Sequence, residues 1–246
     1  MTSAIQSRRP SVVRAGMKKR LGDDPADWGE ILHHPPAYYA QFGWECLDDT
    51  LRITRKQVTL MFEPPEAIRT LNKAKIPFVV MGLYGISGWL KDPRATDDFD
   101  VLVAMKDVKR TAKAICADFP FLTARDTPVV VRLENEGKAL MDIMKPHHPL
   151  FKLALKRVGE ARLHGLKVKV PTKEMALGLK YFAMTSFGRQ PNAKYQDAHD
   201  FINMAKNNKG YDFAMLKELG EMAFAGGGDD LMLQFDLAVS GKMLEL

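Results

Sequence analysis

The sequence lacks any apolar run long enough to cross a membrane, because no stretch approaches the roughly 18 consecutive apolar residues that a spanning helix needs. The N-terminus is basic, but it has no apolar core of the kind found in signal peptides. Cysteine is scarce, since Cys46 and Cys116 are the only two and have no motif spacing. We therefore expect two free thiols, a cytoplasmic protein and no membrane partner.

The sequence also has no internal repeat and no long low-complexity segment. Its 46% hydrophobic and 27% charged residues are ordinary for a globular protein. A length of 246 residues suits one domain with additions, or two small domains. A net charge of +6 permits a polyanionic partner such as RNA, although charge alone identifies no ligand.

Three regions are expected along the chain. Residues 1–60 form an N-terminal extension of unknown role, which contains a basic cluster. Residues 61–170 alternate between strand-like and helix-like patterns and form the predicted core, whereas residues 171–246 are helical throughout. The glycine run at residues 226–228 is predicted to be a flexible linker within the helical region.

The central stretch of the core is a strand that leads into a turn and a short helix. An apolar run over residues 76–81 predicts a buried strand, and Gly82 ends it where helix-like spacing begins. Backbone N–H groups at the start of a helix are free to bind anions, and a glycine lets a phosphate come close. A simple tight turn at Gly82 is the alternative.

Two carboxylates follow on the next predicted strand, over residues 98–103. Asp98 and Asp100 are two residues apart, so on a strand their side chains point to the same face. Neighbouring carboxylates repel each other. A divalent cation between Asp98 and Asp100 would remove this repulsion and create a site that handles phosphates.

This stretch resembles the nucleotidyltransferase superfamily, whose signature is a glycine turn followed by an acidic-x-acidic strand. The likeness is closer to the toxin-type branch related to the AbiEii group, in which a Pro-Arg-x-Thr segment precedes the acidic pair. The glycine pair usual in the family reads Met81-Gly82 here, and the resemblance covers about residues 61–205. The matching positions are Gly82, Pro93, Arg94, Thr96, Asp98 and Asp100.

The resemblance implies an α/β (α+β) fold, with a mixed β-sheet flanked by helices and a C-terminal helical subdomain. It also implies a third acidic residue on a further strand. A hairpin is predicted from residues 129–133 and 138–144, and Asp142 lies in an apolar setting on its returning strand. Asp142 is therefore the match for the third acidic residue, with Glu134 as the fallback.

Further matches occur in the helical region. Related proteins carry a lysine on the corresponding helix that reaches the nucleotide phosphates, and the match here is Lys180. A surface lysine whose stem lies along the helix is the alternative. Asp197 and Asp200 resemble the closing Lys-x-x-Asp-x-x-Asp element of the family. They would orient Lys180 or Arg189 instead of binding metal.

The resemblance thus implies a metal-dependent nucleotidyltransferase that moves an NMP from an NTP to an acceptor hydroxyl and releases pyrophosphate. Oxygen ligands and phosphates suit Mg²⁺, with two ions expected and Mn²⁺ as a substitute. The implied catalytic and metal-binding residues are Asp98, Asp100 and Asp142. The implied nucleotide-binding residues are Gly82, Arg94, Thr96, Lys180 and Asp197.

The acceptor and the biological role remain open at this point. The basic charge and the toxin-type likeness favour tRNA or another RNA as the acceptor, while a protein or a small molecule is also compatible with the sequence. A module of the same fold that binds nucleotide or RNA without turnover is one alternative function. A component of a toxin–antitoxin pair, with an antitoxin protein as partner, is another.

Overall fold

The structure is a computed structural model that describes residues 62–91, 94, 96, 98–163 and 165–244. The predicted extension at residues 1–60, Cys46 and Pro93 lie outside the described residues. Among the helices within these ranges, none is both long enough and apolar enough to cross a membrane.

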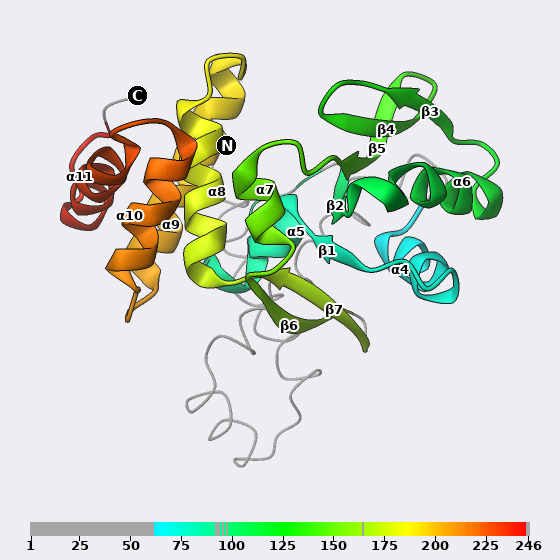
Figure 1. Cartoon of the computed structure of the whole chain (residues 1–246), viewed down its shortest axis with the longest axis horizontal. Coiled ribbons are helices and arrows are strands. Elements are labelled where there is room, and N and C mark those ends of the chain that lie inside the picture. The colour runs from blue at the N-terminus through cyan, green and yellow to red at the C-terminus, as the bar shows by residue number, and fades with distance from the viewer. Residues whose placement is uncertain (1–61, 92–93, 95, 97, 164, 245–246) are drawn as a thin grey trace, which may run out of the picture. The chain divides into compact units, whose positions relative to one another are not determined.

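The core of the described chain is a five-stranded sheet with the order β1-β2-β5-β4-β3 (Figure 1). Strands β2 and β5 run parallel, whereas the other neighbours are antiparallel. The predicted α/β (α+β) class, a mixed sheet flanked by helices, is therefore confirmed. The strands are β1 (Phe78–Val80), β2 (Phe99–Val103), β3 (Thr123–Asp126), β4 (Val130–Asn135) and β5 (Lys138–Met144).

The predicted hairpin is formed by β4 and β5. Its turn consists of Glu136 and Gly137, which both have positive φ, at 50° and 78°. Two-residue turns with positive φ at both positions match the twist of the flanking strands, which explains the tight connection. The hairpin places Asp142 on the strand that lies beside β2.

A β-bulge interrupts this hairpin close to its turn. The pairing shifts by one residue, which leaves Leu140 as the extra residue on β5. A regular hairpin with the same turn would place Arg132 opposite Met141. The bulge places it opposite Asp142 instead. The paired residues are Asn135 with Lys138 and Glu134 with Ala139 before the bulge, and Leu133 with Met141 and Arg132 with Asp142 after it.

Helices and a second hairpin surround the sheet. Helix α6 packs on β3, β4 and β5, and α4 contacts both α6 and β7. Strand β3 is exposed along its whole length and has no apolar periodicity, so the sequence analysis missed it, as it missed α7 and β6. The elements are α4 (Pro64–Lys73), α5 (Gly82–Ile86), η1 (Ser87–Trp89), η2 (Met105–Asp107), α6 (Val108–Asp118), α7 (Pro149–Ala154), β6 (Val158–Leu163) and β7 (Leu166–Pro171).

Four helices follow and pack on one another. Helix α8 contacts α9 and α10, and α11 contacts the same two helices (Figure 1). The boundaries predicted between the core and this helical region stay a prediction. The helices are α8 (Lys173–Thr185), α9 (Pro191–Asn207), α10 (Phe213–Ala223) and α11 (Gly227–Ser240).

The prediction of a flexible linker at residues 226–228 is wrong. Gly227 and Gly228 are the first residues of α11, and they form a close contact with α10. A Cβ atom on Gly227 would lie 2.2 Å from the carbonyl oxygen of Gly220, so only glycine fits there. The glycines therefore allow two helices to approach each other at the backbone.

Polar contacts bind the helical region to the segment that follows α5. The Trp89 indole N–H donates to the carbonyl of Pro171 at 3.4 Å, and the Asn208 amide donates to the carbonyl of Trp89 at 2.7 Å. The backbone N–H of Lys91 donates to the side-chain oxygen of Asn203 at 3.1 Å. The end of helix α9 is thereby fixed beside η1 and the residues that follow it.

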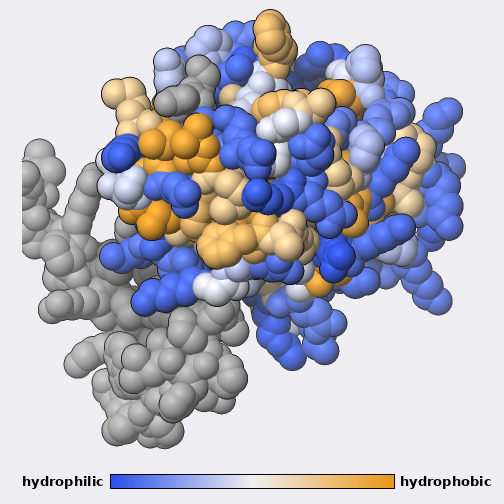
Figure 2. Space-filling view, turned by 60° about the vertical axis from the view of Figure 1, so that its left-hand side comes forward, coloured by the Kyte–Doolittle hydropathy of each residue, from blue (hydrophilic) through white to orange (hydrophobic). Residues whose placement is uncertain are grey.

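The helical region leaves several large apolar side chains exposed, among them Phe213, Phe224, Leu233 and Val239. Figure 2 brings the left-hand side of Figure 1 forward and shows apolar areas among hydrophilic residues. Apolar atoms contribute much of the surface of any folded protein. This exposure by itself therefore identifies no partner.

Phe99 provides a test of the core beside the acidic pair. Its side chain is 1% exposed and meets the Tyr84 ring edge-on at 5.5 Å between centroids. We expect Phe99→Ala to lower the free energy of unfolding by about 3–5 kcal/mol, because it removes apolar contacts and leaves a cavity. Phe187→Ala makes the same chemical change at a fully exposed position and should cost less than about 0.5 kcal/mol. Urea unfolding measures both; similar losses would contradict this packing.

Candidate functional site

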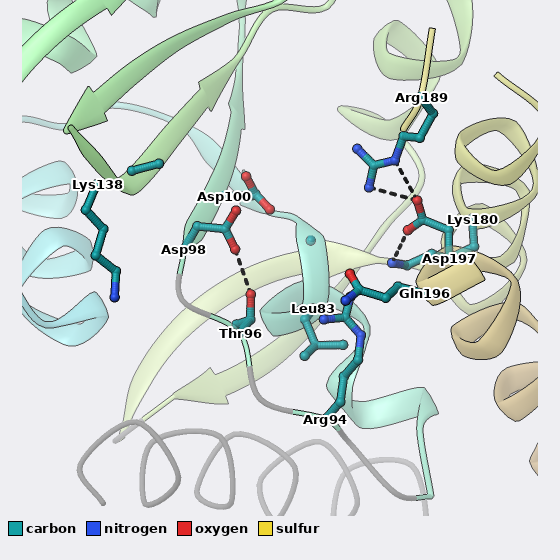
Figure 3. Close-up of a pocket in the computed structure, with 12 residues that line it drawn as sticks. Leu83, Arg94, Thr96, Asp98, Asp100, Lys138, Lys180, Arg189, Gln196 and Asp197 are labelled. Carbon is teal, nitrogen blue, oxygen red and sulfur yellow. Dashed lines mark hydrogen bonds and ion pairs between the residues drawn. The ribbon is translucent and has the colours of Figure 1, made fainter. Parts of the chain in front are cut away.

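A pocket of about 560 Å³ brings together elements that are far apart in the sequence (Figure 3). This volume lies within the usual range for small-molecule sites. Seven of the eight residues predicted from the sequence line it, and Asp142 does not. The lining residues are Gly82, Leu83, Arg94, Thr96, Asp98, Asp100, Lys138, Ala139, Lys180, Arg189, Gln196 and Asp197.

Gly82 and Asp100 are in direct contact at the floor of this pocket. Gly82 has a φ of +57°, a left-handed conformation that side chains other than glycine rarely adopt. A Cβ atom built on Gly82 would lie 2.0 Å from Asp100 Oδ2. Gly82 is therefore required twice, once for the turn into α5 and once to make room for the carboxylate.

The acidic pair lies at the start of β2. The strand begins at Phe99, one residue later than predicted, so Asp98 directly precedes it. The Thr96 hydroxyl donates to Asp98 Oδ1 at 2.6 Å and holds this carboxylate (Figure 3). Loss of contact with water raises the pKa of Asp100 well above its ordinary value, and the negative charges of Asp98 and Asp142 raise it further.

Lys180 faces the acidic pair from α8 and is buried, with 8% exposure. Its ammonium group donates to Asp197 Oδ1 at 2.8 Å and to Asp200 Oδ2 at 2.7 Å. The alternative of a surface lysine is therefore wrong. Asp197 and Asp200 are each 1% exposed, and both accept a hydrogen bond from Lys180.

The same two aspartates also hold two arginines. Arg189 donates from Nε to Asp197 Oδ2 at 2.7 Å, so Asp197 joins Arg189 to Lys180 (Figure 3). Arg94 donates from Nε and Nη2 to the two oxygens of Asp200, each at 3.3 Å. Three cations and two carboxylates leave this wall of the pocket with a net positive charge.

Asp142 is turned toward a different partner. Both of its oxygens accept hydrogen bonds from Arg132, at 2.9 Å from Nε and 2.6 Å from Nη2. The fallback, Glu134, accepts a hydrogen bond from Arg125 at 3.4 Å. Within the described part of the chain, no three acidic, histidine or cysteine side chains converge as a set of metal ligands. The structure thus does not bring Asp142 into a ligand set with the acidic pair.

The donor set of the pocket fits a single Mg²⁺-type site. Mg²⁺ is commonly held by one or two carboxylates, with substrate phosphates and water completing its shell. Asp98 and Asp100 supply two such carboxylates on one side of the pocket. The pKa of Asp100 is raised first by burial and then by the negative charges of Asp98 and Asp142, and a bound cation would compensate these charges.

The pocket also contains residues that the sequence analysis did not propose as site residues. Lys138 follows the hairpin turn, Gln196 precedes Asp197 on α9, and Leu83 follows Gly82. The sequence predicts Arg189 only as a group that the aspartates orient, yet it lines the pocket itself. Its position after α8, eight residues before Asp197, is the one sequence signal that would have indicated it.

The contact between Gly82 and Asp100 predicts a specific stability pattern. Gly82→Ala and Gly137→Ala both place alanine at positive φ, which costs about 1–2 kcal/mol. Only Gly82→Ala also overlaps a neighbour, which should cost about 1–3 kcal/mol more. In an Asp100→Ala background this additional cost should shrink, because the overlapping carboxylate is gone. Urea unfolding of the wild type, the two single variants and the double variant measures the coupling free energy between the two substitutions. If their effects on the free energy of unfolding simply added, the result would argue against the contact.

Lys180 should be essential for stability as well as for charge. In Lys180→Met, Asp197 keeps Arg189 and Asp200 keeps Arg94, but both buried carboxylates lose their shared ammonium group. We expect a loss of about 3–5 kcal/mol in the free energy of unfolding. Lys138→Met is the matched control, because it removes an exposed lysine from the same pocket and should cost less than about 0.5 kcal/mol. Thermal or urea unfolding at neutral pH measures both losses. An equally small loss of stability in the two variants would contradict the buried network.

Comparison with known proteins gives no family assignment, because no family model and no curated protein matches the chain. Among solved structures, an antigenic nucleotidyltransferase-like protein from Paracoccidioides brasiliensis is similar, with 18% identity and a TM-score of 0.47 over 72% of this chain and 89% of that one. JHP933 from Helicobacter pylori is similar with 17% identity and a TM-score of 0.40 over 73% and 80%. Neither likeness identifies an activity.

Proposed function

We propose that the pocket binds a nucleoside triphosphate together with Mg²⁺ and transfers the nucleoside monophosphate to an acceptor hydroxyl. One observation carries this proposal: an acidic pair and a cationic wall face each other across one pocket, with a glycine backbone between them. Mg²⁺-bound polyphosphate needs both, because the ion requires carboxylates and the phosphate oxygens require cations.

Each side chain has a role in this proposal. Asp98 and Asp100 hold the ion, and Thr96 fixes the orientation of Asp98. Lys180 and Arg189 contact the β- and γ-phosphates, while the exposed backbone at Gly82 lets a phosphate approach closely. Arg94 and Asp197 act mainly by holding the cationic wall in place. Asp142 would join as a ligand only if it left Arg132.

The reaction forms a bond between the acceptor oxygen and the α-phosphorus and breaks the bond to the bridging oxygen, so pyrophosphate leaves and the hydroxyl proton passes to water. A bound Mg²⁺ would neutralise negative charge on the phosphate oxygens as they rearrange. Lys180 and Arg189 stabilise the charge that develops on the leaving pyrophosphate. Catalysis is thus mostly positioning and electrostatics.

RNA, such as tRNA, is the acceptor class in this proposal. The net charge of +6 favours a polyanion, and the expected cytoplasmic location provides access to tRNA. A role as a toxin with an antitoxin partner is compatible with this reaction, since blocking an RNA end would stop translation. Growth arrest on expression of the active chain, but not of an inactive variant, would support that role.

A binding module without turnover is the second candidate. The observation in its favour is the Arg132–Asp142 pair, which occupies the residue expected to complete the metal site. Such a module would bind Mg²⁺ and nucleotide in the same pocket and release no pyrophosphate.

The test is pyrophosphate release with each of the four NTPs and Mg²⁺, with and without bulk tRNA. We expect release that requires tRNA, stops with a chelator, and falls at least about 100-fold in Asp98→Ala and in Asp100→Ala, as expected when an electrostatic group is removed. Lys113→Met, which removes an exposed lysine of α6 outside the pocket, should retain full activity. Release without RNA would indicate another acceptor, and nucleotide binding without release would favour the binding module.

A further inference from the structure

Arg132 and Asp142 form a fork-to-fork ion pair on the face of the sheet that carries Asp100. Both guanidinium contacts are within 2.9 Å, and each uses a different carboxylate oxygen. The Asp142 side chain is 8% exposed and that of Arg132 is 36% exposed. The carboxylate is therefore buried with its two oxygens engaged, and the guanidinium reaches it from the neighbouring strand β4.

The position of this pair matters because Asp142 is in register with Asp100. The two residues are direct neighbours on the parallel strands β2 and β5. Neighbouring strands lie roughly 4.8 Å apart, so side chains paired in this way share one face and lie close together. A second cation in a two-ion site, about 4 Å from the first, would need Asp142 oxygens that Arg132 already holds.

Charge balance points in the same direction. Three carboxylates, those of Asp98, Asp100 and Asp142, lie near one another, and Arg132 is paired with that of Asp142. The remaining two match one divalent ion. We infer that this chain uses a single divalent cation, held by Asp98 and Asp100, and that the guanidinium of Arg132 takes the place of a second ion at Asp142. The inference rests on the proposed nucleotide site.

Arg132 acts through Asp142 in this arrangement and is a positioning residue. Its fixed charge keeps the buried carboxylate neutralised whether or not nucleotide is bound, so the site is organised before the ion arrives. Arginine suits this function because it stays protonated and its planar fork matches a carboxylate. A lysine would supply the charge without the two-point geometry.

The test counts ions by electron paramagnetic resonance of Mn²⁺, with two ions and one non-hydrolysable α,β-methylene NTP analogue supplied per full chain, so that a two-ion site could fill. We expect the wild-type chain to give the spectrum of an isolated bound ion. A spin-coupled pair of ions would overturn the inference while leaving the proposed function intact. No bound ion at all would overturn both.

Two variants separate the role of Arg132 from general damage. Asp142→Asn keeps the shape of the side chain and should still give the spectrum of an isolated ion, with the affinity for Mn²⁺ changed less than about threefold. A loss of affinity of tenfold or more would show that Asp142 is a ligand and overturn the inference.

Arg132→Met frees Asp142 and should give the spectrum of a spin-coupled pair of ions. Adding the Asp142→Asn change should abolish this pair. A folded Arg132→Met variant that binds an isolated ion would also overturn the inference. If Arg132→Met does not fold, the wild-type and Asp142→Asn spectra still test whether the chain binds one ion or two.

Discussion

The contact between Gly82 and the Asp100 carboxylate is the constraint on which the site depends. It requires a glycine as the first residue of α5, a left-handed backbone at this glycine, and a carboxylate on β2 that points at it. The Gly82 backbone and the Asp100 carboxylate form the same surface of the pocket, so a substitution at one of them affects the other. The antiparallel pairing of β1 with β2 holds the two strands in the register that the contact requires.

The opposite wall depends on a different interaction, the sharing of two buried aspartates among three cations. Asp197 and Asp200 lie on α9, whereas Lys180 and Arg189 come from α8 and the segment after it, and Arg94 precedes β2. Each carboxylate holds two cations, so the wall is rigid and still positive. A folded helical region is therefore a requirement for the charge of the pocket.

Much of this arrangement was predictable from the sequence, because it depends on patterns within short stretches of the chain. Apolar runs indicated β1, β2 and the β4–β5 hairpin, and the spacing of Asp98 and Asp100 indicated a shared direction. Gly82, Arg94, Thr96, Lys180 and Asp197 line the pocket, although their roles stay predictions. The partner of Asp142 was not predictable, because a regular hairpin would place Met141 opposite Arg132 and only the bulge at Leu140 changes this.

The bulge has a consequence for any change in the length of this hairpin. Leu140 has no partner of its own on β4, so a chain without Leu140 would pair regularly from the turn and would still place Arg132 opposite Asp142. The loss of one residue from β4 between the turn and Arg132 has the opposite effect. With the bulge retained, it would move Arg132 opposite Met141, on the other face of the sheet from Asp142. The two strands of the hairpin therefore differ in the length changes that they tolerate: β5 can lose its extra residue, whereas β4 cannot lose one without separating the ion pair.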